Sequence, residues 1–122
     1  MARRAVSIGG SNVLILGLAF KENCNDIRNT KVIDMIKALK NYNLEVDIVD
    51  PIIDCNCAYK EYGLVVKNKI EKHNYYDAVI LAVAHDDFIR FDLHDWNRLI
   101  KENGIFVDVK GVLPRELKTI RI

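Results

Sequence analysis

Apolar runs and polar connections alternate along this chain. The segment 12–20 contains a continuous apolar run, and residues 78–84 are all apolar. Such runs are typical of strands that are buried on both faces of a parallel sheet. Residues 45–50 alternate polar and apolar side chains, which predicts a strand with one wetter face. Two shorter apolar stretches, 64–66 and 105–109, complete the predicted strands, and 105–109 is expected to be the last.

Helices are expected between these strands. Residues 30–42 place apolar side chains at positions i, i+1, i+4 and i+7, which form one stripe on a helix. Asn29 or Thr30 can cap this helix by accepting a hydrogen bond from an otherwise unpaired backbone N–H. A short helix is expected over 54–62, where Gly63 ends it.

A third helix is expected over 92–103. Asp92 can cap its start, and Gly104 lies where a left-handed C-terminal residue belongs. The side chains expected to face inward are Leu93, Trp96, Leu99 and Ile100. Because strands and helices alternate, the predicted class is α/β: a Rossmann-like, doubly wound, mainly parallel sheet of five or six strands with helices on both faces.

Length and composition indicate one globular domain. With 122 residues the chain is long enough for one core and too short for two. Residues 12–122 are expected to form the domain, and residues 1–11 to be a linker from a preceding region of a longer protein. The formal net charge of +1 lacks the basic excess of a nucleic-acid binder. No apolar run approaches the roughly 20 residues that cross a membrane. Three cysteines without an export signal indicate reduced thiols in the cytoplasm.

The connection from residue 17 to residue 30 is the strongest candidate site. It follows the first strand, precedes the first helix and carries Lys21, Asp26 and Arg28. Parallel α/β sheets bind ligands at such turns, where backbone N–H groups meet an anion, and two cations favour a phosphate-bearing ligand. The alternative is a solvated loop with an internal Asp26–Arg28 ion pair of little energetic value. Only Gly17 of a three-glycine dinucleotide fingerprint is present.

Two further residues invite a functional interpretation that the sequence does not favour. Asp50 ends the second predicted strand, where nicotinamide-binding folds carry a ribose-binding acid, but it lies 33 residues after Gly17 rather than about 20. It is interpreted as a strand terminus leading into the Asp50–Pro51 turn. Cys24 lies where a helix N-terminus can activate a thiol, but no partner histidine is evident, so a packing role is favoured.

The remaining candidates lie later in the chain. Cys55 and Cys57 with His73 lack the second ligand pair of a zinc module, so no metal site is expected. Residues 85–88 follow a buried strand, and an Asp in that place usually caps the next helical turn. Lys110 follows the strand predicted at 105–109, and it is either a ligand contact or an ordinary lysine at a strand end.

The pattern G-x-x-F-K-x-x-x-x-D-x-R at residues 17–28, followed by a helix and by the sequence Val-Asp-Pro at 49–51, resembles the UDP-glucose/GDP-mannose dehydrogenase family. The likeness is to its C-terminal, UDP-sugar-binding domain and extends over nearly the whole chain. Residues 82–85 and 107–111 are similar to the branch of UDP-N-acetylhexosamine 6-dehydrogenases, which serve capsule and O-antigen synthesis.

The resemblance implies an NAD-dependent oxidoreductase that converts a UDP-hexose or UDP-N-acetylhexosamine to its uronate in two hydride transfers. It also implies that an N-terminal NAD-binding domain carries the catalytic cysteine and that a central helical region makes a homodimer. None of the three cysteines here matches that nucleophile. The chain alone is therefore expected to be inactive, with no catalytic residue of its own.

The resemblance also assigns roles to single residues. Phe20 and Lys21 match the pair that contacts the UDP-sugar, and Arg28 matches the arginine that reaches NAD across the interdomain cleft. Asp26 is expected to orient the loop. Lys110 falls near a C-terminal basic substrate contact that is often Arg in relatives.

Two other classes remain as alternatives. A receiver-like signalling module shares the size and the α/β alternation, but it would need an acidic pair just after the first strand, where Gly17 to Phe20 supplies none. A stand-alone nucleotide-binding module is opposed by the missing glycines. The sequence does not identify the sugar.

Overall fold

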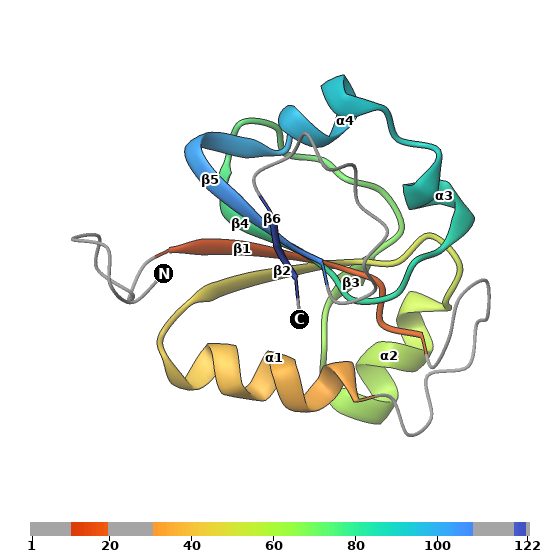
Figure 1. The fold of residues 1–122 in the computed structure, drawn as a ribbon. Coiled ribbons are helices and arrows are strands. Elements are labelled where there is room, and N and C mark those ends of the chain that lie inside the picture. Colours follow the sequence, from red (N-terminus) through yellow and green to blue (C-terminus); the bar gives the residue numbers. More distant parts are fainter. Residues whose placement is uncertain (1–10, 20–30, 109–118, 122) are drawn as a thin grey trace.

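A computed structural model describes residues 11–19, 31–108 and 119–121 of the chain. These residues form a six-stranded sheet in the order β3-β2-β1-β4-β5-β6, in which every pairing is parallel (Figure 1). The strands are β1 (Asn12–Leu16), β2 (Glu45–Val49), β3 (Val66–Lys67), β4 (Tyr76–Leu81), β5 (Ile100–Asp108) and β6 (Thr119–Arg121). The predicted α/β class and parallel sheet are confirmed.

Helices cover both faces of the sheet, as predicted (Figure 1). They are α1 (Val32–Asn41), α2 (Cys55–Tyr62), α3 (Asp86–Ile89) and α4 (Leu93–Asn97). Ile36 of α1 and Ala58 of α2 pack in one hydrophobic cluster with Ile15 of β1. Phe88 of α3 and Trp96 of α4 belong to a second cluster on the other face, so the core position predicted for Trp96 is confirmed.

Local capping contacts set the boundaries of two helices; the Gly63 end and the Asp92 cap were predicted, whereas the Asp54 cap was not. The side chain of Asp54 accepts a hydrogen bond of 2.9 Å from the backbone N–H of Asn56 at the start of α2. Gly63 ends this helix with a left-handed φ of 67°. Asp92 accepts a bond of 2.8 Å from the backbone N–H of Asp95 and caps α4. Short polar side chains and a glycine thus set these boundaries.

The start of α1 differs from the prediction. The helix begins at Val32, and Lys31 occupies the N-cap position without a side-chain cap. The proposed caps Asn29 and Thr30 lie outside the described residues, as do residues 1–10 of the predicted linker.

The helix predicted over 92–103 is wrong in its second half. The helix α4 ends at Asn97, and β5 begins at Ile100, because the backbone N–H of Tyr76 bonds to the Leu99 carbonyl and Ile100 pairs with Tyr76. Leu93, expected to face inward, is 39% exposed. The strand pairing of residues 99–100 with β4 therefore overrides their helical spacing.

Gly104 is also not a helix terminus. It lies inside β5, next to a register irregularity in the pairing with β4. A Cβ at this position would come within 2.6 Å of the Ile100 Cβ. The glycine is needed because the irregular strand brings its own residues close together. A further strand, β6, follows β5 and was not placed from the sequence.

The strand order creates a switch point between β1 and β4. The strand β1 pairs with β2 on one side and with β4 on the other, so the connections leaving β1 and β4 run to opposite faces of the sheet. Open α/β sheets bind ligands outside the carboxyl ends of the strands at such a point. A ligand site is therefore expected among the residues that follow β1, β2, β3 and β4.

Candidate functional site

Gly17 begins the turn that leaves β1. Its φ is +99°, a conformation that side chains with a Cβ rarely adopt. A Cβ here would lie 2.5 Å from the Cβ of Val83 and 2.9 Å from its backbone nitrogen. The Gly17 N–H donates a 2.8 Å hydrogen bond to the carbonyl of Val49 at the end of β2. The turn is thus pressed against the end of β4, and only glycine fits.

The carboxylate of Asp50 holds the next two residues of this turn. Its Oδ2 accepts hydrogen bonds from the backbone N–H groups of Leu18, at 2.8 Å, and of Ala19, at 3.1 Å. Its Oδ1 accepts from the N–H groups of Ile52, at 2.9 Å, and of Ile53, at 3.2 Å. The side chain has no exposed surface. One oxygen therefore shapes the turn after β2, and the other fixes the turn after β1.

His85 contacts the same carboxylate from the end of β4. Its Nε2 lies 2.9 Å from Asp50 Oδ2, and both side chains are fully buried. Because an ionised carboxylate only accepts hydrogen bonds, Nε2 of His85 carries a proton and donates. The imidazole also lies against the ring of Phe88, with centroids 5.9 Å apart.

Asn68 completes the arrangement from the end of β3. Its side-chain amide donates to the carbonyl of Asp50 at 2.8 Å and to that of Ile53 at 3.2 Å. The backbone N–H of Asp50 donates to the Lys67 carbonyl at 2.9 Å. Residues from the ends of four neighbouring strands thus meet around Asp50.

The environment keeps Asp50 ionised. Burial alone would raise its pKa, but the hydrogen bonds from His85 and from the backbone of Leu18 and Ile52 outweigh burial and lower the pKa below its usual value.

The pKa of the nearby Cys55 thiol is shifted upward instead. Burial first, and then the negative charges of Asp50 and Asp54, raise the pKa of Cys55, so its thiol is not activated as a nucleophile.

The structure describes only some of the residues that the sequence singled out. Phe20, Lys21, Asp26, Arg28, Lys110 and Cys24 lie outside the described residues. The roles predicted for them stay predictions.

The interpretation of Asp50 as a turn residue is confirmed by its bonds to Ile52 and Ile53 but is incomplete, because it missed the contacts with Leu18, Ala19 and His85. At the start of α3 the residue in the N-cap position is His85, and its side chain makes no cap hydrogen bond. The prediction that an Asp caps this turn is therefore wrong, since Asp86 and Asp87 lie within the first turn of the helix.

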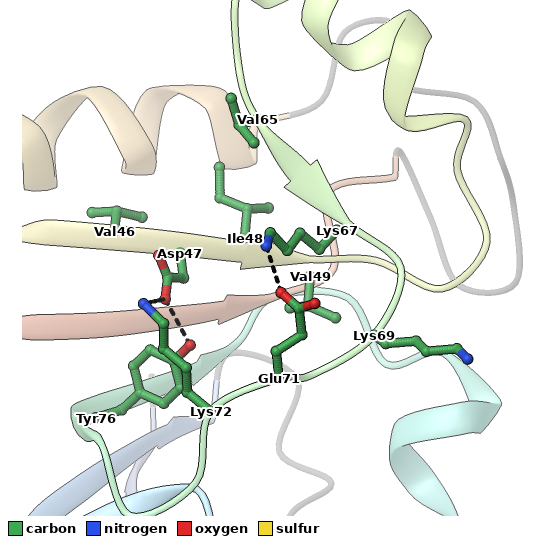
Figure 2. Close-up of a pocket in the computed structure, with 10 residues that line it drawn as sticks. All are labelled: Val46, Asp47, Ile48, Val49, Val65, Lys67, Lys69, Glu71, Lys72 and Tyr76. Atoms are coloured by element: carbon green, nitrogen blue, oxygen red, sulfur yellow. Dashed lines mark hydrogen bonds and ion pairs between the residues drawn. The ribbon is translucent and has the colours of Figure 1, made fainter.

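A hollow of about 210 Å³ lies at the β2–β3 side of the sheet (Figure 2). The hydroxyl of Tyr76 donates to Asp47 Oδ2 at 2.7 Å, and the ammonium of Lys72 lies 3.4 Å from the same oxygen. Lys67 pairs with Glu71. Figure 2 shows the Lys69 side chain pointing away from these groups. Because four of its charged groups pair with one another, this hollow presents no strong field to a ligand.

Among the described residues, two other features are absent. No cluster of three or more His, Cys, Asp or Glu side chains in that part of the chain could hold a metal ion. None of the described helices has the length and apolar character needed to cross a membrane.

Comparison with known proteins identifies the family. Residues 14–115 match the family model described as "UDP-glucose/GDP-mannose dehydrogenase family, UDP binding domain". The chain belongs to this family. The match covers the turn after β1, Asp50 and His85, so the site lies within the family's UDP-binding domain.

Relatives in this family align with nearly all of the chain. It is 41% identical to a UDP-N-acetyl-D-glucosamine 6-dehydrogenase of Salmonella typhi, over 100% of this chain and 28% of that protein. It is 40% identical to protein CapL of Staphylococcus aureus, over 93% of this chain and 26% of that protein. The chain thus spans about a quarter of the length of these relatives.

The fold also occurs in a solved dehydrogenase. An NDP-N-acetyl-D-galactosaminuronic acid dehydrogenase from Methanosarcina mazei superposes with a TM-score of 0.81 at 21% identity. The superposition covers 99% of this chain and 26% of that one. At this identity the likeness supports the fold alone.

Proposed function

We propose that this chain is the substrate-binding domain of an NAD-dependent nucleotide-sugar 6-dehydrogenase and holds the UDP part of a UDP-sugar. The observation that carries the proposal is the position of the family pattern at 17–28. It starts in the turn at the β1–β4 switch point, where α/β sheets bind ligands, and Asp50 fixes the first residues of that turn.

The proposed contacts come from the residues that match the family pattern. Phe20 and Lys21 contact the UDP-sugar, with Lys21 acting as a compact cation for its phosphates. Arg28 reaches NAD across the cleft to the other domain, and Asp26 orients the loop. Lys110 supplies a second basic contact to the substrate.

The described residues do not fit a complete NAD site. In dinucleotide-binding folds, the backbone N–H groups of the glycine-rich turn after the first strand meet the pyrophosphate. Here the N–H groups of Leu18 and Ala19 already donate to the internal carboxylate of Asp50. This supports the proposal that NAD is held mainly by another domain of the full-length protein, which also carries the catalytic cysteine. It argues against a stand-alone dinucleotide-binding module.

Relatives at about 40% identity support a proposal for the substrate class and the biological setting, whereas several less similar relatives are named for UDP-glucose. The Salmonella typhi protein is named for UDP-N-acetyl-D-glucosamine, and CapL is a second close relative. We therefore place the whole enzyme in the conversion of a UDP-N-acetylhexosamine to its uronate, for capsule or O-antigen precursors. It acts as a homodimer in the cytoplasm, where NAD and UDP-sugars are available.

Titration of the 122-residue chain with separate ligands tests the proposal. We expect UDP and UDP-N-acetylglucosamine to shift the same amide resonances, with a Kd on the order of 1 mM because contacts from the other domain are missing. NAD is expected to bind more weakly than UDP. Micromolar NAD binding without UDP binding would contradict the proposal and support the stand-alone dinucleotide-binding module.

A further inference from the structure

We infer that Asp50 and His85 are positioning residues for the nucleotide-sugar site: together they fix the backbone of Leu18 and Ala19, and through it the contacts that follow in the chain. The inference rests on the proposed function, since it assigns the substrate contacts to the residues directly after Ala19. Neither Asp50 nor His85 needs to touch the ligand for this role.

The two oxygens of Asp50 have separate tasks, and this separation supports the inference. Oδ1 satisfies the turn of its own strand, through Ile52 and Ile53. Oδ2 reaches a different connection and accepts from Leu18 and Ala19, which lie 32 and 31 positions away. A residue that only closed the turn after β2 would need the first set of bonds and not the second.

His85 supports the contact between Asp50 and the β1 turn. Its Nε2 bonds to Oδ2 and so holds the oxygen that fixes the β1 turn. A buried polar pair of this kind contributes little net stability, because a protein with well-packed apolar side chains of similar volume in its place is often as stable or more stable. Such a pair does restrict the backbone to one arrangement, which is what a binding site requires of its supporting residues.

The proposed substrate contacts come directly after the residues that Asp50 holds, so a restraint on Ala19 also restrains them. Phe20 follows Ala19 directly, and Lys21 is the next residue. The N–H of Ala19 is held at 3.1 Å from a carboxylate that has no exposed surface. Small displacements of supporting groups have large effects on binding and catalysis. Loosening this anchor should therefore weaken UDP binding even where no contact to the ligand is removed.

The experiment compares four variants of the 122-residue chain. His85→Met removes the hydrogen-bond donor and introduces an apolar side chain of similar length, whereas His85→Gln retains a side-chain N–H donor. Asp50→Asn places an amide group against the N–H groups of Leu18 and Ala19. Asp47→Asn is the matched control, because Asp47 lies on β2, the strand that Asp50 follows, accepts a hydrogen bond from Tyr76 and makes no bond to the β1 turn in the described structure.

Two quantities are measured for each variant: the affinity for UDP by titration, and the exchange rates of the Leu18 and Ala19 amides by NMR. We expect His85→Met and Asp50→Asn to weaken UDP binding at least fivefold. They should also raise the exchange of these two amides at least tenfold relative to the amides of β4, which report global unfolding. His85→Gln should retain most of both properties, and Asp47→Asn should change neither.

The outcomes separate this inference from the proposed function. A wild-type chain that binds neither UDP nor UDP-sugars overturns the proposed function. A wild-type chain that binds UDP, with His85→Met or Asp50→Asn binding it as tightly, overturns only the positioning role. The same conclusion follows if the Leu18 and Ala19 amides exchange in step with those of β4, because the pair would then contribute only to global stability. If one of these two variants does not fold, the other decides.

Discussion

The Nε2 atom of His85 lies 2.9 Å from Oδ2 of Asp50, although the two residues are 35 positions apart in the chain. Both side chains are fully buried. The contact joins the end of β4 to the end of β2 across the end of β1, where the backbone of Leu18 and Ala19 donates to the same oxygen. A single carboxylate therefore organises the edge of the sheet at its switch point.

The stability of the domain should depend on pH through Asp50. The folded-state pKa of Asp50 lies below the value in an unfolded chain, so its carboxylate stabilises the fold above the ordinary aspartate pKa of about 4. This contribution is lost as the pH falls below about 4 through the folded-state pKa. We expect Asp50→Asn to lower the free energy of unfolding by about 3 kcal/mol at pH 7, because it breaks a buried polar pair.

Urea unfolding of the wild type and Asp50→Asn at pH 7, 5 and 3 measures this effect. The difference between the two proteins should be similar at pH 7 and 5 and smaller at pH 3. Asp47→Asn, which alters a side chain that is 42% exposed, should cost less than about 1 kcal/mol at pH 7. A pH-independent difference between Asp50→Asn and the wild type would show that the charge of Asp50 is not responsible.

Gly17→Ala should destabilise the fold by about 3 kcal/mol. An alanine would have to adopt a φ of +99° and would place its Cβ 2.5 Å from the Cβ of Val83. Gly63→Ala is the matched control, because Gly63 also has a left-handed φ, of +67°, but a Cβ there would meet nothing within 4 Å. It should cost only about 1 kcal/mol, from backbone strain alone. If thermal or urea unfolding shows that the two variants lose the same free energy of unfolding, the contact with Val83 is not the cause of the destabilisation by Gly17→Ala.

Local patterns were sufficient to predict much of the fold. The strands β1 and β4 are buried on both faces, so they appear in the sequence as uninterrupted apolar runs. The Asp92 cap and the Gly63 end of α2 depend on contacts within a few residues, which spacing alone can indicate. The turn at Gly17 was predicted because the apolar run of β1 leads into a glycine.

Features that depend on tertiary contacts were missed. Residues 99–100 have helical spacing, but they pair with β4, and this pairing ends α4 early. The bond between Asp50 and His85 joins two strand ends that are distant in the chain, and no local signal connects them. What could have pointed to it is the parallel topology itself, because it brings polar residues that follow β2 and β4 to one edge of the sheet.

Lys21→Ala should weaken UDP binding about tenfold, or by about 1.4 kcal/mol. The proposed function makes Lys21 a direct cationic contact to the phosphates, in contrast to Asp50 and His85. Lys69→Ala is the control, because it removes the same charge from a side chain that points away from the neighbouring charged groups (Figure 2). Isothermal titration at low ionic strength, where the phosphate contact is least screened, compares the two. Equal affinities for the wild type and Lys21→Ala would take Lys21 out of the site.

The 122-residue chain should produce no NADH from a UDP-sugar and NAD. Oxidation of the C6 alcohol in this family is expected to need a nucleophilic cysteine and a bound dinucleotide, and the family resemblance places both in another domain. The pKa of Cys55 is raised by burial and by Asp50 and Asp54, which keeps its thiol protonated and unreactive. The N–H groups of Leu18 and Ala19 lie in the turn after β1, where dinucleotide-binding folds hold the pyrophosphate, and here they are bonded to Asp50.

The absorbance of NADH at saturating UDP-N-acetylglucosamine and NAD measures this directly, with the Salmonella typhi relative as the positive control. UDP-sugar-dependent NADH formation by the purified chain would contradict the prediction, and Cys24→Ser, Cys55→Ser and Cys57→Ser would then identify the thiol involved. A chain that is inactive yet binds UDP would support the proposal that this domain holds the nucleotide sugar and that the chemistry belongs to another part of the enzyme.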